Sequence, residues 1–379
     1  MDQNMMIEQA VASFRTLLLE QLDRVQRMEN DACASNNEKN CLTIGIIDGD
    51  GIGPIIVGQA ERVAEKLLSK EIAEGSVKLK RIEGLTIENR LATGKTLPDG
   101  VLDAIKECDV LLKGPTTTPK GGSMESANVA LRRELDLFAN VRPVSIPEKG
   151  IDWTFFRENT EGEYVLGSKG VQLGDKMAVD FKVTTALGTE RIARAGFEFA
   201  RRNGKKNVAI VTKANIMKKT DGNFSAICHE VAKDYPEITA EDWYVDIMAA
   251  NLINDSMASR FEVFVLPNLY GDILTDEAAQ IQGGVGTAGS ANTGARYGMF
   301  EAIHGSAPRM VEQGIAEYAN PASILRALVM LLDHAGLTDK ANALAKAIDK
   351  TDSDVSVKVT GDRDGATCRQ YTDALIENL

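Results

Sequence analysis

Several features are missing from this chain of 379 residues, and each absence argues against a class of protein. No apolar run approaches the roughly 18 residues of a membrane-spanning helix, so we expect no membrane segment. The N-terminus lacks the basic region and apolar core of a secretory signal peptide. Acidic residues that are not typical of an organelle transit peptide also interrupt it: Glu8, Glu20, Asp23 and Glu29. These absences predict a cytoplasmic protein.

An excess of basic residues is missing as well. The chain has 43 basic and 55 acidic residues, for a formal net charge of −12. A protein that binds nucleic acid neutralises phosphates with Lys and Arg, so this balance argues against nucleic acid as the main partner. An anionic small molecule needs only a local cluster of arginines, and the composition permits one.

Cysteine is sparse and carries no metal-binding pattern. Five cysteines are scattered without the spacing of metal ligands, and we interpret them as reduced thiols: Cys33, Cys41, Cys108, Cys228 and Cys368. The apolar fraction of 44% and the charged fraction of 26% are those of an ordinary globular protein. A chain of this length can form two lobes around large cores.

Residues 5–30 form a separate helical pattern before a polar linker at 35–40. Apolar residues occupy both positions of a 4-3 repeat over about three heptads: Ile7, Val11, Phe14, Leu18, Val25 and Met28. Gln21 interrupts this stripe. The pattern indicates either an amphipathic helix that lies on its own domain or a self-association helix. It carries no chemistry.

From Cys41 onward, short apolar runs alternate with helical patterns. Strands are predicted at 42–47, 110–112, 208–211 and 261–266, a helix after the turn that ends at Pro54 and through Leu68, and mostly helix from about residue 322. This alternation predicts an α/β fold with a largely parallel sheet. The glycine-rich turn at 48–54 contains G-x-G-x-G and not the G-x-G-x-x-G fingerprint, so we assign no Rossmann nucleotide site to it.

The segment Asn268 to Asp276 places two carboxylates, Asp272 and Asp276, directly after an apolar strand. If Asp272 opens a helix, both side chains lie over one face, one turn apart. Two hard oxygen ligands in this arrangement suit Mg²⁺ or Mn²⁺. A helix cap at Asp272 and a solvated first-turn acid at Asp276 would account for the same residues without a metal.

Four more residues are candidates for chemistry. Arg142 and Arg157 each close an apolar stretch, where a charge needs a partner. Their planar guanidinium groups suit either substrate carboxylates or an internal ion pair. Tyr164 and Lys213 are candidate proton-transfer groups, and Lys213 follows a strand end, the usual place for chemistry in an open α/β sheet. An ordinary surface lysine is the alternative for Lys213.

Eight motifs occur in order along the chain. They are GDGIGP (49–54), KGP (113–115), SxNVALR (126–132), RELDLFANVRP (133–143), FRENTEGEY (156–164), KANIMK (213–218), NLYGDILTD (268–276) and HGSAP (304–308). Together they resemble the β-decarboxylating dehydrogenases, the family of isocitrate and 3-isopropylmalate dehydrogenases. The resemblance covers about residues 41–379. Ile55 departs from it, because the family usually has Glu after GDGIGP.

The resemblance implies a two-lobed α/β fold that is not of the Rossmann type, with a mixed, largely parallel sheet and an extra N-terminal amphipathic helix. It implies a large cofactor-binding lobe from 41–137 and 284–379, a small lobe with the dimer contact from 138–283, and a helix and linker over 1–40. It also implies a homodimer whose active sites borrow residues from the partner subunit. The N-terminal helix could extend that dimer into a larger assembly.

The implied reaction is oxidation of a 2-hydroxy acid by a nicotinamide cofactor, followed by loss of CO₂, with Mg²⁺ or Mn²⁺ bound. By motif position, Asp272 and Asp276 are metal ligands, joined by Asp246 of the partner subunit. The partner's Lys213 would deprotonate the substrate hydroxyl, and Tyr164 would protonate the carbon that loses CO₂. The implied substrate contacts are Ser126, Asn128, Arg132, Arg142 and Arg157. The implied cofactor contacts are Lys113, Thr118, Asn215, His304, Gly305, Ala307, Arg309, Met310 and Asn320.

Isocitrate, a tricarboxylate, is the substrate that the loop at 126–128 favours, because a hydroxyl and an amide suit a polar tail better than an isopropyl group. Homoisocitrate differs by one methylene, which is a weak discriminator, and 3-isopropylmalate is the other alternative. Glu125 departs from the basic or neutral residue expected beside Ser126, and its charge is unfavourable near a trianion unless it points away.

NAD is the cofactor that the adenosine loop favours, with NADP as the alternative. The family's NADP enzymes place Lys-Tyr after the proline, whereas this chain has Arg309-Met310. A 2′-phosphate needs several positive donors, and the region 357–361 offers neither the Tyr nor the Arg of those enzymes. A non-catalytic regulatory subunit of a hetero-oligomeric isocitrate dehydrogenase is the alternative from another class. It is disfavoured because Tyr164, Lys213 and the three aspartates are all present.

Overall fold

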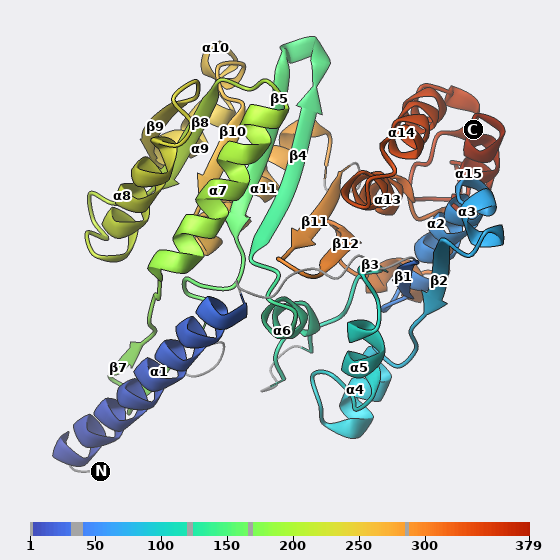
Figure 1. Ribbon diagram of the computed structural model, residues 1–379. Helices are drawn as coiled ribbons and strands as arrows, with labels where there is room; N and C mark the ends of the chain where they lie inside the picture. The colour runs from blue at the N-terminus through green and yellow to red at the C-terminus, as the bar shows by residue number, and fades with distance from the viewer. Residues whose placement is uncertain (1–2, 32–40, 120–123, 166–169, 285–287) are drawn as a thin grey trace. The chain divides into compact units, whose positions relative to one another are not determined.

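The computed structural model describes residues 3–31, 41–119, 124–165, 170–284 and 288–379 (Figure 1). The predicted linker at 35–40 and residues 121–123 before Ser126 lie outside the described residues. The chain divides into two compact units, Met1–Asn37 with Lys149–Leu274, and Glu38–Glu148 with Thr275–Leu379. We call them unit 1 and unit 2. The lobe boundaries predicted at 137/138 and 283/284 stay a prediction.

Unit 2 carries six strands in the order β2-β1-β3-β12-β11-β4. The strands are β1 (Leu42–Ile47), β2 (Val77–Arg81), β3 (Val110–Lys113), β4 (Ala139–Ile146), β11 (Gly289–Thr293) and β12 (Gly298–Ala302). β2, β1, β3 and β12 run parallel to one another, and β11 pairs antiparallel with both β12 and β4. The predicted strand at 42–47 is confirmed, and the one at 110–112 extends by one residue.

Helices cover both faces of these strands. They are α2 (Gly53–Leu67), α3 (Ser69–Ala73), α4 (Ile87–Thr93), α5 (Val101–Lys106), α6 (Ala127–Glu134), α12 (Pro308–Glu312), α13 (Ala322–His334), α14 (Thr338–Asp352) and α15 (Cys368–Glu377), with 3₁₀ turns at Pro147–Lys149, Ala316–Tyr318 and Val355–Val357. Ile44, Ile46 and Leu112 pack in one core with α2, α13 and α14, while Ile47 and Leu111 pack in a second core with α5 and α6. The strands are apolar on both faces because each face is covered.

Four strands of unit 1 lie side by side in the order β5-β10-β8-β9, each parallel to the next. They are β5 (Ile151–Glu158), β8 (Asn207–Thr212), β9 (Thr239–Tyr244) and β10 (Val263–Leu266). The helices are α7 (Ala186–Arg202), α8 (Thr220–Ala232), α9 (Val245–Leu252), α10 (Asp255–Ala258) and α11 (Asn268–Gln282), the last of which runs on into unit 2. α7 lies along β5 and β10 (Figure 1). The predicted α/β fold with a mixed, largely parallel sheet is therefore confirmed.

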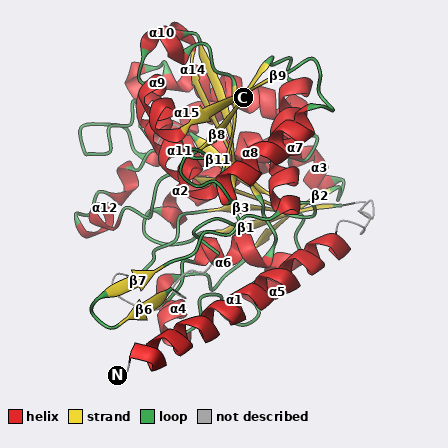
Figure 2. Cartoon of the chain, turned by 90° about the vertical axis from the view of Figure 1, so that its left-hand side faces the viewer, coloured by secondary structure: helices red, strands yellow, loops and turns green. Residues whose placement is uncertain are grey.

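The N-terminal helix α1 (Gln3–Asp31) belongs to unit 1. It runs beside the hairpin of β6 (Val171–Leu173) and β7 (Met177–Val179), as Figures 1 and 2 show. Leu17 and Met28 are buried, whereas Ile7, Val11 and Leu18 are exposed. The inward face is therefore rotated from the predicted heptad stripe, most of which stays exposed. No helix among the described residues is long and apolar enough to cross a membrane.

Candidate active site

Helix α11 carries both predicted metal-binding carboxylates, but it begins earlier than the sequence suggested. Its first residue is Asn268, directly after Pro267, and the Gly271 amide already donates to the Pro267 carbonyl at 3.0 Å. Proline fits just before or within a first helical turn because its fixed φ is helical. Asp272 therefore lies in the second turn and does not open the helix. Capping cannot explain these two acids, which still project one turn apart from one helix.

In unit 1, Asp272 belongs to a connected cluster of polar side chains. The Arg157 guanidinium pairs with Asp272 and donates to the Asn268 Oδ1 atom from Nε at 3.0 Å and from Nη2 at 2.7 Å. The Tyr164 hydroxyl donates to Asp272 Oδ2 at 2.7 Å, and the guanidinium carbon lies 5.4 Å from the Tyr164 ring centroid. The Arg157 side chain is 1% exposed, while Asp272 is 41% exposed. Gly271 gives the arginine room, because a Cβ there would meet Arg157 Cγ at 2.4 Å.

In unit 2, Asp276 has its own arginine. Arg142 Nη1 donates to Asp276 Oδ1 and to Thr275 Oγ1, each at 2.7 Å. Arg142 is buried, and its Nε atom has no hydrogen-bond partner in the described structure. Arg142 and Arg157 thus each already pair with one of the two predicted metal ligands, as the alternative of an internal ion pair also requires.

Lys213 and Asp246 form a separate pair in unit 1. The ammonium group lies 2.5 Å from Asp246 Oδ1, and the Asp246 side chain is 66% exposed. The hydrogen bond from Lys213 lowers the pKa of the Asp246 carboxyl. The Lys213 amide donates to the buried carboxylate of Asp221 at 2.8 Å, which fixes the backbone where β8 ends. Among the described residues of one chain, no three His, Cys, Asp or Glu side chains gather as a metal site.

A buried charge cluster in unit 2 contains two predicted ligand contacts. Lys113 on β3 lies opposite Glu301 on β12, with Nζ 3.0 Å from Glu301 Oε2. Arg132 approaches the other carboxylate oxygen at 3.4 Å, and Asn292 donates to it at 2.9 Å. Burial by itself would raise the pKa of Glu301, but Lys113 and Arg132 outweigh it and hold the pKa at about 2. Arg132 keeps an unpaired Nε atom, so part of its donor capacity remains.

The predicted substrate loop leads into α6. Ser126 is the residue before the helix and makes no side-chain capping bond, and Asn128 Oδ1 accepts from Thr116 Oγ1 at 3.0 Å. Glu125 is held by both terminal nitrogens of Arg133, at 2.6 and 2.9 Å. Its charge is therefore compensated within the protein, which answers the concern about an acid beside Ser126.

The predicted adenosine loop follows β12. His304 Nδ1 lies 3.0 Å from the Gly305 carbonyl, its Nε2 atom is buried without a partner, and burial lowers the pKa of the ring. Gly305 faces open space, and Ala307 adopts a left-handed conformation with φ 46° before α12. Arg309 is exposed on that helix.

Four further residues that were predicted to contact the cofactor lie in separate parts of the two units. Met310 packs against the unit 2 core, and Asn320 Oδ1 accepts from the Ala322 amide at 2.8 Å. Thr118 is exposed in unit 2 and Asn215 in a turn of unit 1.

The glycine-rich turn at 48–54 contacts several neighbouring loops through hydrogen bonds. Gly51 has φ 60°, and a Cβ there would meet the Ser306 carbonyl oxygen at 2.0 Å. The Asp50 carboxylate accepts from the amides of Ile87 and Thr117, each at 2.7 Å. This turn therefore joins the ends of β1 and β3 to the HGSAP loop, a structural role that its motif did not reveal.

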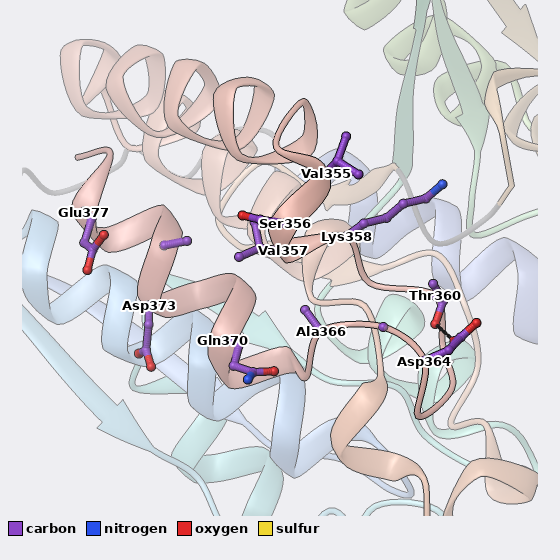
Figure 3. Close-up of a pocket in the computed structure, with 12 residues that line it drawn as sticks. Val355, Ser356, Val357, Lys358, Thr360, Asp364, Ala366, Gln370, Asp373 and Glu377 are labelled. Atoms are coloured by element: carbon purple, nitrogen blue, oxygen red, sulfur yellow. Dashed lines mark hydrogen bonds between the residues drawn. The ribbon is translucent and has the colours of Figure 1, made fainter.

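Sequence reasoning missed three residues that hold the predicted groups in place: Asn268, Asp221 and Glu301. Asn268 and Glu301 lie in or beside matched segments, but their partners are distant in sequence. A cavity of about 650 Å³ lies in unit 2 beside the 3₁₀ turn at Val355–Val357 and α15 (Figure 3). None of the predicted site residues lines it, so we do not assign the chemistry to it.

The profile of the family "Isocitrate/isopropylmalate dehydrogenase" matches residues 43–378. The chain is 36% identical to isocitrate dehydrogenase [NAD] subunit 2, mitochondrial, of Schizosaccharomyces pombe, over 90% of this chain and 89% of that protein. It is 40% identical to 3-isopropylmalate dehydrogenase of Archaeoglobus fulgidus, over 81% of this chain and 90% of that protein. Other relatives are named isocitrate dehydrogenase [NADP] and homoisocitrate dehydrogenase.

The fold also matches that of a solved structure. The crystal structure of isocitrate dehydrogenase from Methylococcus capsulatus superposes with a TM-score of 0.78 at 36% identity, covering 89% of this chain and 99% of that one. The chain therefore belongs to the isocitrate/isopropylmalate dehydrogenase family.

Proposed function

We propose that this protein catalyses oxidative decarboxylation of isocitrate to 2-oxoglutarate and CO₂ with reduction of NAD, in the presence of Mg²⁺ or Mn²⁺. The observation that carries the proposal is the cluster of Arg157, Tyr164 and Asp272, which joins a buried carboxylate-binding cation, a proton donor and a hard oxygen ligand. The family membership and the isocitrate dehydrogenase names among the relatives support it.

Asp272 and Asp276 would hold the metal, together with Asp246 of the partner subunit. Their carboxylate oxygens fit a hard divalent cation, and both α11 carboxylates reach solvent. A bound cation would polarise the oxygen of the carbon that is oxidised, and a bound nicotinamide would accept the hydride.

The arginines Arg132, Arg142 and Arg157 would bind the substrate carboxylates in bidentate fashion and orient the reacting carbon. Since Arg142 and Arg157 each hold an aspartate in the structure, binding of a cation would free part of their donor capacity for the substrate. Tyr164, whose hydroxyl already donates to Asp272, would deliver a proton to the carbon that loses CO₂.

The remaining groups would come from a second copy of the chain. Lys213 and Asp246 form an accessible pair in unit 1, and within one chain the described residues supply no third acidic ligand beside Asp272 and Asp276. We infer a homodimer in which the partner's Lys213 accepts the proton of the substrate hydroxyl. The exposed apolar residues of α1 allow a larger assembly.

Mixed dimers test this arrangement directly. Asp272→Asn and Lys213→Met each inactivate both sites of their own homodimer under this proposal. When the two variants are denatured and refolded together, mixed dimers contain one site with both groups intact, and activity should return. If well-folded mixed dimers stay inactive, each site is built within one chain and the proposed sharing is wrong.

Isocitrate is favoured as substrate because Ser126 and Asn128 offer polar groups and Glu125 is engaged by Arg133. NAD is favoured because Arg309 is a single exposed cation in the adenosine loop, whereas a 2′-phosphate needs several donors.

The first assay is cofactor reduction by the purified protein with Mg²⁺, in which D-isocitrate, homoisocitrate and 3-isopropylmalate are each paired with NAD and with NADP. Fast reduction of NAD by isocitrate alone supports the full proposal. Preference for another acid or for NADP corrects that one assignment. Reduction in no combination, with the protein folded, refutes the catalytic proposal and favours a regulatory subunit.

A further inference from the structure

The N-terminal helix α1 contacts the segment that carries the proposed proton donor. Arg24 Nη1 donates to the Thr160 carbonyl at 3.1 Å, and its Nη2 atom pairs with the Glu161 carboxylate. The helix precedes residues 43–378, which match the family. Its sequence pattern suggested packing or self-association but no link to the site.

The position of Arg24 is fixed on both sides. Leu17 and Met28, two turns before and one turn after it, are buried. Phe14 stacks on Phe181 with ring centroids 5.0 Å apart, which anchors the earlier part of the helix. Arg24 is therefore held over the segment 158–164 by packing that does not depend on its own charge.

The partner of Arg24 is a buried acid in an acidic environment. Glu161 is 2% exposed, and its carboxylate accepts from the Thr185 amide at 2.8 Å. Glu158 is also buried and accepts from the amides of Thr160 and Glu161. Burial, reinforced by the charge of Glu161, raises the pKa of Glu158 to about 7. A buried acid beside another acid needs a compensating cation. Arg191 of α7 also contacts this segment and donates to Thr160 Oγ1 at 3.3 Å.

Glu161 is joined to the proposed site through its backbone. Its carbonyl accepts from Asn268 Nδ2 at 2.9 Å, and Asn268 Oδ1 in turn accepts from Arg157. Arg157 pairs with Asp272, to which Tyr164 donates. A continuous set of polar contacts therefore runs from α1 to the proposed proton donor and metal ligand.

We propose that Arg24 is a positioning residue of the active site, through which α1 holds the segment 158–164 in the geometry that catalysis needs. The proposal rests on the function proposed above. Arg24 touches neither substrate nor cofactor; it fixes Glu161, and with it the turn that presents Tyr164 and the carbonyl that orients Asn268. Small displacements of such groups reduce turnover strongly, because an active site depends on near-attack geometry.

The test is steady-state kinetics of Arg24→Met in the full-length protein. Arg15→Met is the matched control, because Arg15 is an exposed arginine of the same helix. We expect kcat to fall by about 10-fold or more for Arg24→Met, with wild-type circular dichroism at the assay temperature, and by less than twofold for the control. Arg24→Lys, which keeps the charge, should recover much of the loss. Equal kinetics for Arg24→Met and the control would overturn the proposal.

A double variant separates positioning from general destabilisation. In Arg24→Met with Glu161→Gln, no charge is left unpaired, so kcat should fall less than the product of the two single effects predicts. Strictly multiplicative effects contradict a coupling between Arg24 and Glu161.

Amide hydrogen exchange gives a readout that does not need activity. Exchange at residues 158–165 should be faster in Arg24→Met than in Arg15→Met. If the wild-type protein reduces no cofactor, the proposed function fails, and this exchange result alone decides whether Arg24 holds the segment. Unchanged exchange overturns the proposal in either case.

Discussion

The buried ion pair of Lys113 and Glu301 allows us to predict how much one substitution lowers the free energy of unfolding. We consider Glu301→Gln, which keeps the shape and an acceptor for Asn292 but removes the charge. Lys113 is fully buried and Glu301 is only 5% exposed in the wild type. The variant therefore leaves the buried ammonium group of Lys113 without the negative charge beside it. Breaking a buried pair by removing one partner costs roughly 3–5 kcal/mol.

The lowered pKa of Glu301 indicates a stabilisation of similar size. The lowering from 4.5 to about 2 corresponds to roughly 3 kcal/mol of stabilisation from the charged carboxylate. Because the folded pKa is lowered, this contribution is complete above the unfolded pKa and is lost as the pH falls toward the folded value. The stability of the wild type should therefore decrease between about pH 4.5 and pH 2 more steeply than that of Glu301→Gln.

Urea unfolding followed by far-UV circular dichroism is the assay. Tryptophan fluorescence would not serve, because Trp153 and Trp243 both lie in unit 1. We expect a lower midpoint at unchanged slope for Glu301→Gln and a partial recovery when Lys113→Met is added. Glu107→Gln, which breaks the solvated pair with Lys80, is the control and should change the midpoint little. A midpoint for Glu301→Gln equal to that of this control would refute the assignment of a stabilising buried pair.

Three further outcomes are expected. Lys213→Met should abolish oxidation of isocitrate while decarboxylation of added oxalosuccinate survives in part, and equal loss of both steps in a coupled assay would contradict the role of Lys213. Asp221→Asn should lower the free energy of unfolding by up to about 3–5 kcal/mol, because the buried Lys182 loses the charge of Asp221, 2.6 Å away, and keeps the more distant Glu163, at 3.4 Å; a thermal transition within a degree of wild type would contradict this. Gly51→Ala should cost roughly 2 kcal/mol or more, because a left-handed φ and the Ser306 carbonyl both oppose a Cβ, and normal thermal stability would disprove that account.

Local sequence patterns predicted several helices and strands of the fold. The runs at 42–47 and 208–211 are strands because apolar β-branched residues there are buried on both faces. The helix predicted at 5–30 extends over Gln3–Asp31. The helix predicted after Pro54 and through Leu68 begins two residues earlier, at Gly53, and ends at Leu67. Helix α11 begins at Asn268 and not at Asp272, because Pro267 favours helical backbone in the turn that follows it.

The sequence by itself determined the residue types and their order, and hence the family, since motifs such as NLYGDILTD depend only on local spacing. Only the tertiary structure decided which groups are paired. Arg157 with Asp272, Lys113 with Glu301, and Arg24 with Glu161 join residues 115, 188 and 137 positions apart. No periodicity encodes such pairs. They form because strand order and helix packing bring buried charges together, and a buried charge is stable only beside its opposite.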